Sequence, residues 1–330
     1  MSATTRPRIF SGIKPTGHVH LGNYLGALKH WAREQHNADA IYCVVDLHAL
    51  TVEHDPATLR ESTRELCAIL LAVGLDPAVC TLFQQSHVPE HAELSWLMEC
   101  TASFGEMQRM VQFKDKSEGQ MSVRVGLLTY PALMAADILL YQTTHVPVGD
   151  DQRQHLELSR TLAQRFNHNF GQTFTVPEAV VPPIGARLMD LQNPTGKMGK
   201  SSDSLQGTIY LLDDAATVKR KVMRAVTDTD NEVRFDQAGK PGVSNLLQML
   251  SACTDGTPPS ELATRYTQYG PLKKDTVEAV NALLEPIRAR YAELDADPGH
   301  VEKQYRAGAD KARAAAGATL AAAKHAIGLT

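Results

Sequence analysis

The sequence predicts an α/β protein, with a Rossmann-like parallel sheet in its first half and a mostly helical second region. Short apolar, β-rich runs alternate with helix-periodic segments through the first half of the chain, which is typical of a parallel sheet covered by helices. The second half loses these short runs and becomes helical after a loop rich in Gly, Lys and Ser at 193–204. With 330 residues, 43% of them hydrophobic, the chain is long enough for about two domains.

The alternation also predicts the elements of the first half. An apolar run at 8–12 indicates the first strand, and the segment 21–36 has the spacing of a helix. In the same way we expect strands at 40–46, 81–85 and 146–149, and helices at 56–73, from about 90 to 116, and after 150. In sheets of this kind, ligands bind beyond the carboxyl ends of the strands.

The second half is expected to be almost all helical from residue 214. Its expected breaks lie at 228–231, 239–242, 255–259 and 295–299. The last segment, 301–327, is rich in alanine and has no proline, so it predicts one long helix.

Charge and cysteine content narrow the class of protein. A net charge of -4 and a pI near 6.4 argue against a generally basic nucleic-acid binder, although a local basic patch stays compatible with them. Five dispersed cysteines without a CxxC pair predict free thiols in a reducing compartment. Because we find neither an N-terminal signal segment nor a run of ~20 apolar residues, we expect a cytoplasmic protein that does not associate with membranes.

The stretch PTGHVHLGNY at 15–24 joins the first strand to the first helix. Backbone N–H groups at a helix start attract phosphate, and Gly22 removes a Cβ where a base or sugar approaches. His20 and Asn23 supply polar side chains beside that helix start. On these residues alone, a nucleotide-binding loop and an ordinary capped turn are equally supported.

Asp137 is an isolated carboxylate in the apolar helical run PALMAADILLY, where an unpaired charge is costly. Tyr130, Met134 and Asp137 are spaced i, i+4 and i+7, so they share one helix face. This face predicts an aromatic, methionine-lined pocket with one acceptor, which suits the donor-only N–H of an indole. A capped or salt-bridged structural aspartate is the alternative.

Two further patterns are rejected as sites. The string GKS at 199–201 lacks the glycine that a phosphate-binding Walker loop needs five positions earlier, where Pro194 stands. His87 and His91 are four residues apart, but Pro89 interrupts the helix that would align them. We therefore predict two surface histidines rather than a zinc site.

Five segments in order resemble the class I aminoacyl-tRNA synthetases, in the form of the bacterial tryptophanyl enzymes. The stretch at 15–24 resembles the HIGH signature with Asn23 as its last residue, and KMGKS at 197–201 resembles the KMSKS signature. FSGI at 10–13, AADILLY at 135–141 and the segment 146–155 match as well. The resemblance runs essentially from end to end.

The resemblance implies a two-step reaction. L-tryptophan and ATP give tryptophanyl-adenylate and pyrophosphate, and the aminoacyl group then passes to the 3′ adenosine of tRNA(Trp). ATP is expected to carry Mg²⁺, with no dedicated metal site and no tightly bound cofactor. Attack of a carboxylate on the α-phosphate needs no protein nucleophile, so catalysis rests on positioning and charge stabilisation.

The same resemblance implies three sets of residues, of which several have ordinary alternatives as surface lysines, core residues or caps. The expected catalytic residues are His20, Asn23, Lys116, Lys197 and Lys200. The expected ATP-binding residues are Lys14, Pro15, Thr16, Gly22, Asn23, Gly149, Asp150, Asp151, Leu188, Lys197, Met198, Gly199, Lys200 and Ser201. The expected tryptophan-binding residues are Phe10, His48, Tyr130, Met134, Asp137, Val148 and Gln152.

Two positions depart from the family pattern. Gly199 replaces the middle serine of the second signature, which loosens the loop and removes a hydroxyl. Lys14 stands where the family has glutamine and adds a cation near the expected triphosphate or amino-acid carboxylate. We hypothesise that Lys14 changes ATP or inhibitor binding, as in a second, inhibitor-tolerant copy of the enzyme. A tyrosyl-tRNA synthetase and a catalytically silent, tRNA-binding regulatory paralogue are the alternatives.

The resemblance also divides the chain. It implies a catalytic domain at 1–191, completed by a C-terminal helix at 298–330, and an anticodon-binding domain at 192–297. In the latter, Lys219, Arg220, Lys221 and Arg224 are candidates for phosphate contacts, with a solvated helix face as the alternative. A homodimer whose tRNA spans both subunits is expected on the same ground.

Overall fold

A five-stranded sheet forms the centre of the first half of the chain in a computed structural model, which describes residues 6–119, 122–149, 152–180, 187–199 and 205–330. All strand pairings are parallel, and the strand order is β3-β2-β1-β4-β5. The order reverses between β1 and β4, and the crevice at the carboxyl ends of such a pair is where α/β sheets bind ligands. The strands are β1 (Arg8–Ile13), β2 (Asp39–Val44), β3 (Thr81–Gln84), β4 (His145–Pro147) and β5 (Glu178–Val180).

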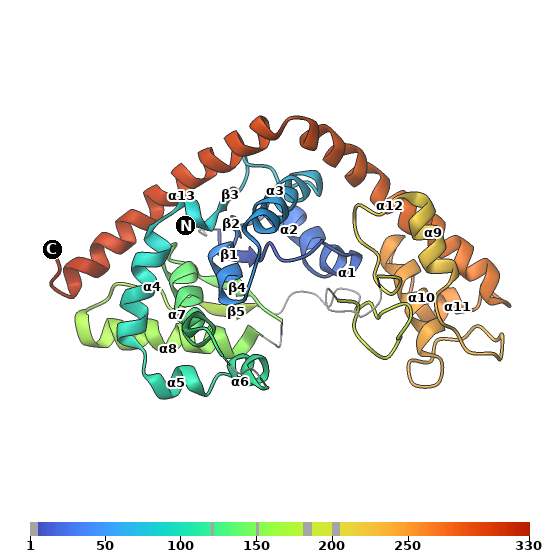
Figure 1. Cartoon of the computed structure of the whole chain (residues 1–330), viewed down its shortest axis with the longest axis horizontal. Coiled ribbons are helices and arrows are strands. Elements are labelled where there is room, and N and C mark those ends of the chain that lie inside the picture. The colour runs from blue at the N-terminus through green and yellow to red at the C-terminus, as the bar shows by residue number, and fades with distance from the viewer. Residues whose placement is uncertain (1–5, 120–121, 150–151, 181–186, 200–204) are drawn as a thin grey trace, which may run out of the picture.

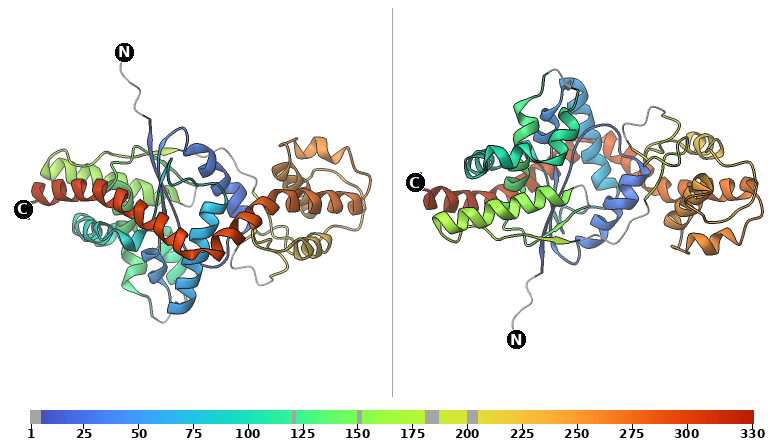
Figure 2. Two further views of the ribbon diagram at one scale, coloured as in Figure 1. Left: turned by 90° about the horizontal axis from the view of Figure 1, so that it is seen from above. Right: turned by 90° about the horizontal axis from the view of Figure 1, so that it is seen from below.

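Helices pack on both faces of the sheet (Figures 1 and 2). Successive strand residues alternate between two hydrophobic cores: Ile9 and Tyr42 belong to one, Phe10 and Cys43 to the other. Strands buried on both faces are expected in a parallel sheet. The helices of this half are α1 (Leu21–Asn23), α2 (Lys29–Glu34), α3 (Pro56–Ala72), α4 (Glu90–Thr101), α5 (Phe104–Gln108), α6 (Val111–Ser117), α7 (Val125–Leu139) and α8 (Arg153–Phe170).

The predicted α/β class is confirmed, and four predicted strands lie within a few residues of their expected bounds. The helix expected at 21–36 is continuous but not uniform, since a π-helical turn at Tyr24–Leu28 separates α1 from α2. Strand β5 was not predicted. It has three residues with little burial, so it carries no hydrophobic pattern.

The second half contains α9 (Ala215–Met223), α10 (Pro241–Cys253), α11 (Pro259–Ala263) and α12 (Tyr269–Ala296). The prediction of nearly continuous helix is wrong between α9 and α10, where residues 224–240 are irregular. The ammonium of Lys240 is buried there and donates to Asp228 at 2.8 Å and to the hydroxyl of Tyr269 at 3.1 Å. These polar side chains hold the segment by bonds between positions 12 and 29 residues apart in the sequence.

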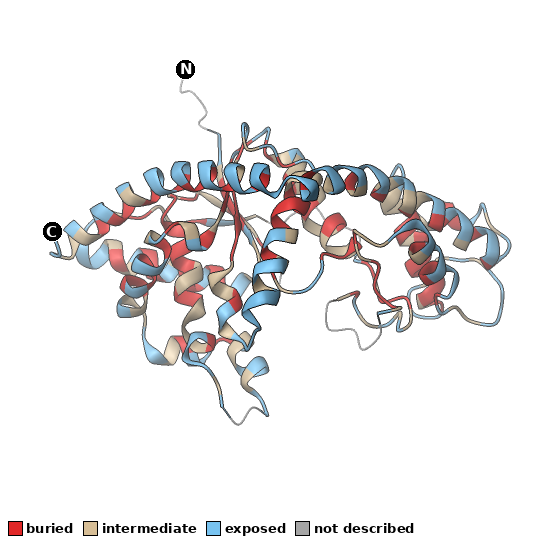
Figure 3. Cartoon of the chain, turned by 45° about the horizontal axis from the view of Figure 1, so that its top comes forward, coloured by how far each residue is buried: buried red, intermediate tan, exposed pale blue. Residues whose placement is uncertain are grey.

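The predicted final helix is confirmed as α13 (Pro298–Ala326). Together α12 and α13 form an arch over the molecule (Figure 1), and α13 packs back on β3 and α4. Its buried residues face the sheet and its exposed ones face outward (Figure 3). The fit is close at Gly308, where a Cβ would stand 1.9 Å from the carbonyl oxygen of Leu82.

The two halves share one hydrophobic core. It runs from Leu28 and Leu70 on one face of the sheet to Leu246 and Leu284 in the helical region. All five cysteines are free thiols. Within the described ranges, no helix is long and apolar enough to span a membrane.

Candidate active site

A cavity of about 800 Å³ opens where β1 and β4 end. This is the switch point of the sheet, so the sequence of strands itself creates the crevice. The walls come from the ends of both strands and from α2, α6 and α7. All seven residues expected to bind tryptophan line it, namely Phe10, His48, Tyr130, Met134, Asp137, Val148 and Gln152. Lys14, Lys116 and Gly149 line it as well.

The floor of the cavity is a paired carboxylate. Asp137 is only 2% exposed. Its Oδ2 accepts a hydrogen bond from His48 Nε2 at 2.8 Å, and its Oδ1 accepts from Gln85 Nε2 and His91 Nδ1, both at 2.6 Å. Burial raises the pKa of Asp137, but His48 and His91 more than offset it and hold the pKa well below its usual range. The group is therefore an anion at neutral pH.

This network corrects the expectation for His91, which was predicted to be a surface residue. His91 is fully buried and its Nε2 contacts the hydroxyl of Tyr141 at 2.7 Å. Pro89 is the residue before α4, where it has no helical hydrogen bond to lose, so it begins the helix rather than interrupting it. His87 is half-buried on the preceding turn. Within the described ranges, no group of three His, Cys, Asp or Glu side chains is arranged to hold a metal ion.

Aromatic rings form the sides of the cavity. The ring of Phe10 stacks on Tyr141 with centroids 5.7 Å apart, and His48 meets Tyr130 edge-on at 6.1 Å. The hydroxyl of Tyr130 bonds to His155 Nε2 at 2.7 Å, which fixes the ring. An apolar slot above an anionic acceptor is the result, and this combination suits a flat aromatic group that carries one N–H.

Two lysines make the rest of the cavity wall cationic. Lys14 is half-buried, and its Nζ lies 3.5 Å from Thr51 Oγ1. Burial and the nearby charge of Lys116 lower the pKa of Lys14. Lys116 is exposed, and its Nζ lies 5.9 Å from the centre of the Tyr130 ring. Two like charges facing one cavity repel each other until an anion binds between or beside them.

The first signature forms a capped helix start beside the cavity. His20 Nδ1 accepts from the Asn23 backbone N–H, and Asn23 Oδ1 accepts from the His20 N–H. This reciprocal cap is the ordinary alternative noted from the sequence. Since Nδ1 is the acceptor, a neutral His20 carries its proton on Nε2 and remains a donor. His20, Asn23, Pro15, Thr16 and Gly22 do not line the cavity.

The described part of the second signature is held by main-chain bonds. Lys197 is exposed and pairs with Met189 in an isolated bridge, and the Met198 N–H donates to Leu188 O at 3.0 Å. Leu188 and Met198 are both buried. The carbonyl of Gly199 accepts from Thr208 Oγ1. The expected site residues Asp150, Asp151, Lys200 and Ser201 lie outside the described residues.

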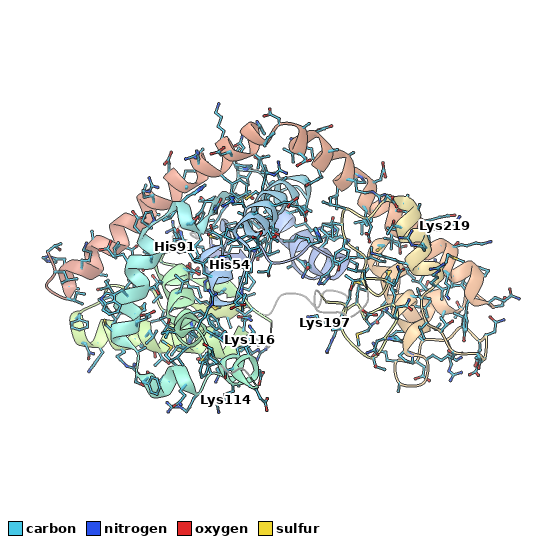
Figure 4. All side chains as sticks on the ribbon, in the orientation of Figure 1. His54, His91, Lys114, Lys116, Lys197 and Lys219 are labelled. Carbon is cyan, nitrogen blue, oxygen red and sulfur yellow. The ribbon has the colours of Figure 1, made fainter. Side chains whose placement is uncertain are left out.

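Main-chain bonds also tie the first signature to the segment that follows the second one. The Leu21 N–H donates to Ile209 O at 2.8 Å, and the Leu211 N–H donates to Val19 O at 2.9 Å. Lys116 and Lys197 lie on the concave side of the molecule, below the arch of α12 and α13 (Figure 4). Of these two cations, Lys116 lines the cavity.

One of the basic residues considered for nucleic-acid contact is structural. Lys221 is 4% exposed, and its ammonium donates to Asp213 at 2.7 Å and to Thr208 O at 2.8 Å. Lys221 is therefore unavailable to phosphate. Lys219 and Arg220, on the same helix α9, are exposed.

This sheet, its cavity and the two signatures together define a class I aminoacyl-tRNA synthetase. The chain belongs to the family of class I tRNA synthetases for tryptophan and tyrosine (W and Y), whose model matches residues 1–285. Within that family it belongs with the bacterial tryptophan–tRNA ligases.

Sequence and structure agree on this placement. The chain is 57% identical to "Tryptophan--tRNA ligase 1" of Streptomyces coelicolor, covering 98% of this chain and 97% of the relative. It is 50% identical to the tryptophan–tRNA ligase of Caldanaerobacter subterraneus, over 98% of each. The tryptophanyl-tRNA synthetase of Mycoplasma pneumoniae superimposes with a TM-score of 0.88 at 39% identity over 99% of both chains. The Campylobacter jejuni enzyme, solved with ADP and tryptophan, gives 0.86 at 34% identity over 98% of this chain and 100% of that one.

Proposed function

We propose that this chain activates L-tryptophan with ATP to tryptophanyl-adenylate and pyrophosphate and then transfers the aminoacyl group to tRNA(Trp). The observation that carries the proposal is one cavity that combines a buried anionic acceptor, an aromatic slot and two lysines. A zwitterionic aromatic amino acid and a polyphosphate need these three features together.

Tryptophan occupies the floor of the cavity in this proposal. Its indole N–H donates to Asp137 Oδ2, which accepts one bond from His48 and has capacity for a second. The indole ring lies against Phe10, Met134 and Val148, which line the same space. His48, Tyr130 and Gln152 complete the binding site. The identities of 57% and 50% to tryptophan–tRNA ligases support tryptophan over tyrosine as substrate.

ATP binds at the first signature with Mg²⁺ as its counter-ion. The Nε2–H of His20 faces phosphate at the positive end of the helix, with Asn23 beside it. Lys116, Lys197 and Lys200 balance the charge that develops on the α-phosphate and on leaving pyrophosphate. Leu188 and Met198 are buried, so they act through the main chain. The remaining ATP contacts are Lys14, Pro15, Thr16, Gly22, Gly149, Asp150, Asp151, Gly199 and Ser201.

We assign the catalytic domain to residues 1–191 with the helix at 298–330, and anticodon binding to residues 192–297. The exposed Lys219 and Arg220 of α9 support a phosphate-contacting surface there. Several large apolar side chains on helices α4 to α7 are exposed, which supports a homodimer in which the partner subunit covers them. They are Trp96, Phe104, Val111 and Val125. The free thiols agree with a cytoplasmic location.

ATP–pyrophosphate exchange with each of the twenty amino acids tests the proposal. Exchange with tryptophan alone is the expected result. Exchange with tyrosine would indicate a tyrosyl enzyme, and no exchange would indicate a silent paralogue. Lys200→Ala is expected to lower kcat for adenylate formation, whereas Asp137→Asn is expected to raise KM for tryptophan.

A further inference from the structure

A chain of buried polar groups leads from the cavity floor into the core of the first half. His48 contacts Asp137, Asp137 contacts His91, and His91 contacts Tyr141, over distances of 2.8, 2.6 and 2.7 Å. His91 and Tyr141 have no more than 1% of their surface exposed, and they do not line the cavity. His91 lies on α4 (Figure 4). These two residues cannot touch a substrate in the cavity.

The chemistry of the groups fixes the direction of each hydrogen bond. An ionised carboxylate only accepts, so His91 donates from Nδ1 to Asp137. In a neutral histidine, Nε2 is then an acceptor, and the hydroxyl of Tyr141 donates to it. Among the described residues, His91 Nε2 is the partner of that hydroxyl. The tyrosine therefore keeps the histidine proton on the nitrogen that faces Asp137.

The acceptor capacity of Asp137 is almost fully used by these contacts. Its Oδ1 receives two donors, from Gln85 and His91, and its Oδ2 receives one, from His48. A carboxylate oxygen has two acceptor positions. Because Oδ1 is bonded to both Gln85 and His91, the carboxylate cannot rotate. The one remaining acceptor position is on Oδ2, the oxygen that also contacts the cavity residue His48.

We propose that His91 is a positioning residue for substrate selection, which orients the Asp137 carboxylate so that one acceptor position is presented to the indole N–H. Tyr141 supports it by fixing its tautomer. The inference rests on the proposed function, because it concerns how the same cavity selects tryptophan. It assigns specificity to a residue that contacts Asp137 but does not line the cavity.

The test compares tryptophan with 3-(benzothiophen-3-yl)alanine, in which sulfur replaces the indole N–H. The readout is the ratio of kcat/KM for the two amino acids in ATP–pyrophosphate exchange. His91→Leu is expected to raise KM for tryptophan and to lower the ratio about 10- to 100-fold, since it removes a charge-assisted bond. KM for ATP and kcat stay nearly unchanged, because the contact acts on binding. His87→Leu is the matched control and leaves the ratio unchanged.

A pair of amide variants separates positioning from packing, also where His91→Leu fails to fold. Asparagine places its amide nitrogen where Nδ1 stands, whereas glutamine places it where Nε2 stands. His91→Asn is therefore expected to retain most of the selectivity and His91→Gln to lose it. Equal ratios in the two variants would overturn the inference, as would a fall in activity that is the same for both amino acids. If the wild-type enzyme shows no exchange with tryptophan, the proposed function fails first and the inference falls with it.

Discussion

Replacing Lys14 with glutamine removes a half-buried cation from the wall of the cavity. In the free protein, burial and the charge of Lys116 already lower the pKa of Lys14, so its ammonium is held in an unfavourable place. An anionic ligand relieves this repulsion when it binds. The loss of Lys14 should therefore weaken the binding of whichever anion faces it, the ATP triphosphate or the tryptophan carboxylate.

The magnitude follows from burial. A lysine 4 Å from a phosphate or carboxylate oxygen gains at most about 4 kcal/mol at an effective dielectric constant near 20. Part of this is spent on desolvation, and a charge-assisted hydrogen bond contributes about 1.5–3 kcal/mol net. Lys14→Gln should then raise the dissociation constant of the anion about 10- to 150-fold. The exposed Lys116 should give about 1 kcal/mol or less in ground-state binding, which makes Lys116→Gln the matched comparison.

Two measurements identify the anion. KM for ATP reports on the triphosphate, and the ratio of KM for tryptophan to the inhibition constant of tryptophanamide reports on the carboxylate. In Lys14→Gln one of these should change at least 10-fold, and the change should shrink at high salt. If both change by less than about twofold, Lys14 contributes nothing to anion binding. The hypothesis of an inhibitor-tolerant copy would then be wrong as well, because it depends on this charge.

Three other predictions concern stability and tRNA binding. Gly308→Ala should destabilise the protein by about 1–3 kcal/mol through overpacking. Gly317→Ala on the same helix should stabilise it by about 0.5–1 kcal/mol, since a Cβ there stands 4.0 Å from the Glu90 carboxylate, an ordinary contact distance. Urea denaturation compares the two variants, and equal midpoints would refute the close contact at Gly308. Lys221→Met should cost about 1–3 kcal/mol, because Asp213 loses its ammonium partner and keeps only the Tyr210 N–H. Lys219→Ala should leave the urea midpoint unchanged and reduce the salt slope of tRNA binding by about one. Arg165 on α8 donates a hydrogen bond to Glu106 and lowers the pKa of Glu106 to about 2. Because this folded-state pKa lies below the ordinary value of 4.5, the stability that Glu106 contributes is present above pH 4.5 and is lost as the pH falls toward 2. The difference in urea midpoint between wild type and Glu106→Gln should therefore narrow from pH 5 to pH 3, and a constant difference would contradict this assignment.

The parts of the fold that carry a strong hydrophobic pattern could be predicted from the sequence. Strands β1 to β4 are buried on both faces, and α13 is an uninterrupted alanine-rich segment. The irregular segment before α10 could not be predicted in the same way, because the bonds of Lys240 to Asp228 and Tyr269 join positions far apart in the sequence. The local hydrophobic periodicity of a sequence does not predict contacts between such distant positions.

In the candidate site, too, the residues with a local sequence pattern could be predicted, and the contacts between distant positions could not. Asp137 was singled out because a carboxylate in an apolar helix needs a partner, but its donors Gln85 and His91 lie 52 and 46 residues away in the sequence. The surface prediction for His91 is wrong because a proline can begin a helix as well as break one, and Pro89 directly precedes α4. The sequence does carry one signal. A buried anion requires hydrogen-bond donors, so every histidine and glutamine near an apolar segment is a candidate donor to Asp137.

The return of α13 to the first half has a consequence for synthesis on the ribosome. Strand β3 is one of the two outer strands of the sheet, and the helix that packs on it is made after every other described element. At about 5–20 residues per second, the sheet waits on the order of tens of seconds for this cover. During that time its outer strand is open to pairing with other nascent chains. Protection by a chaperone is thus needed most while the second half is still being translated.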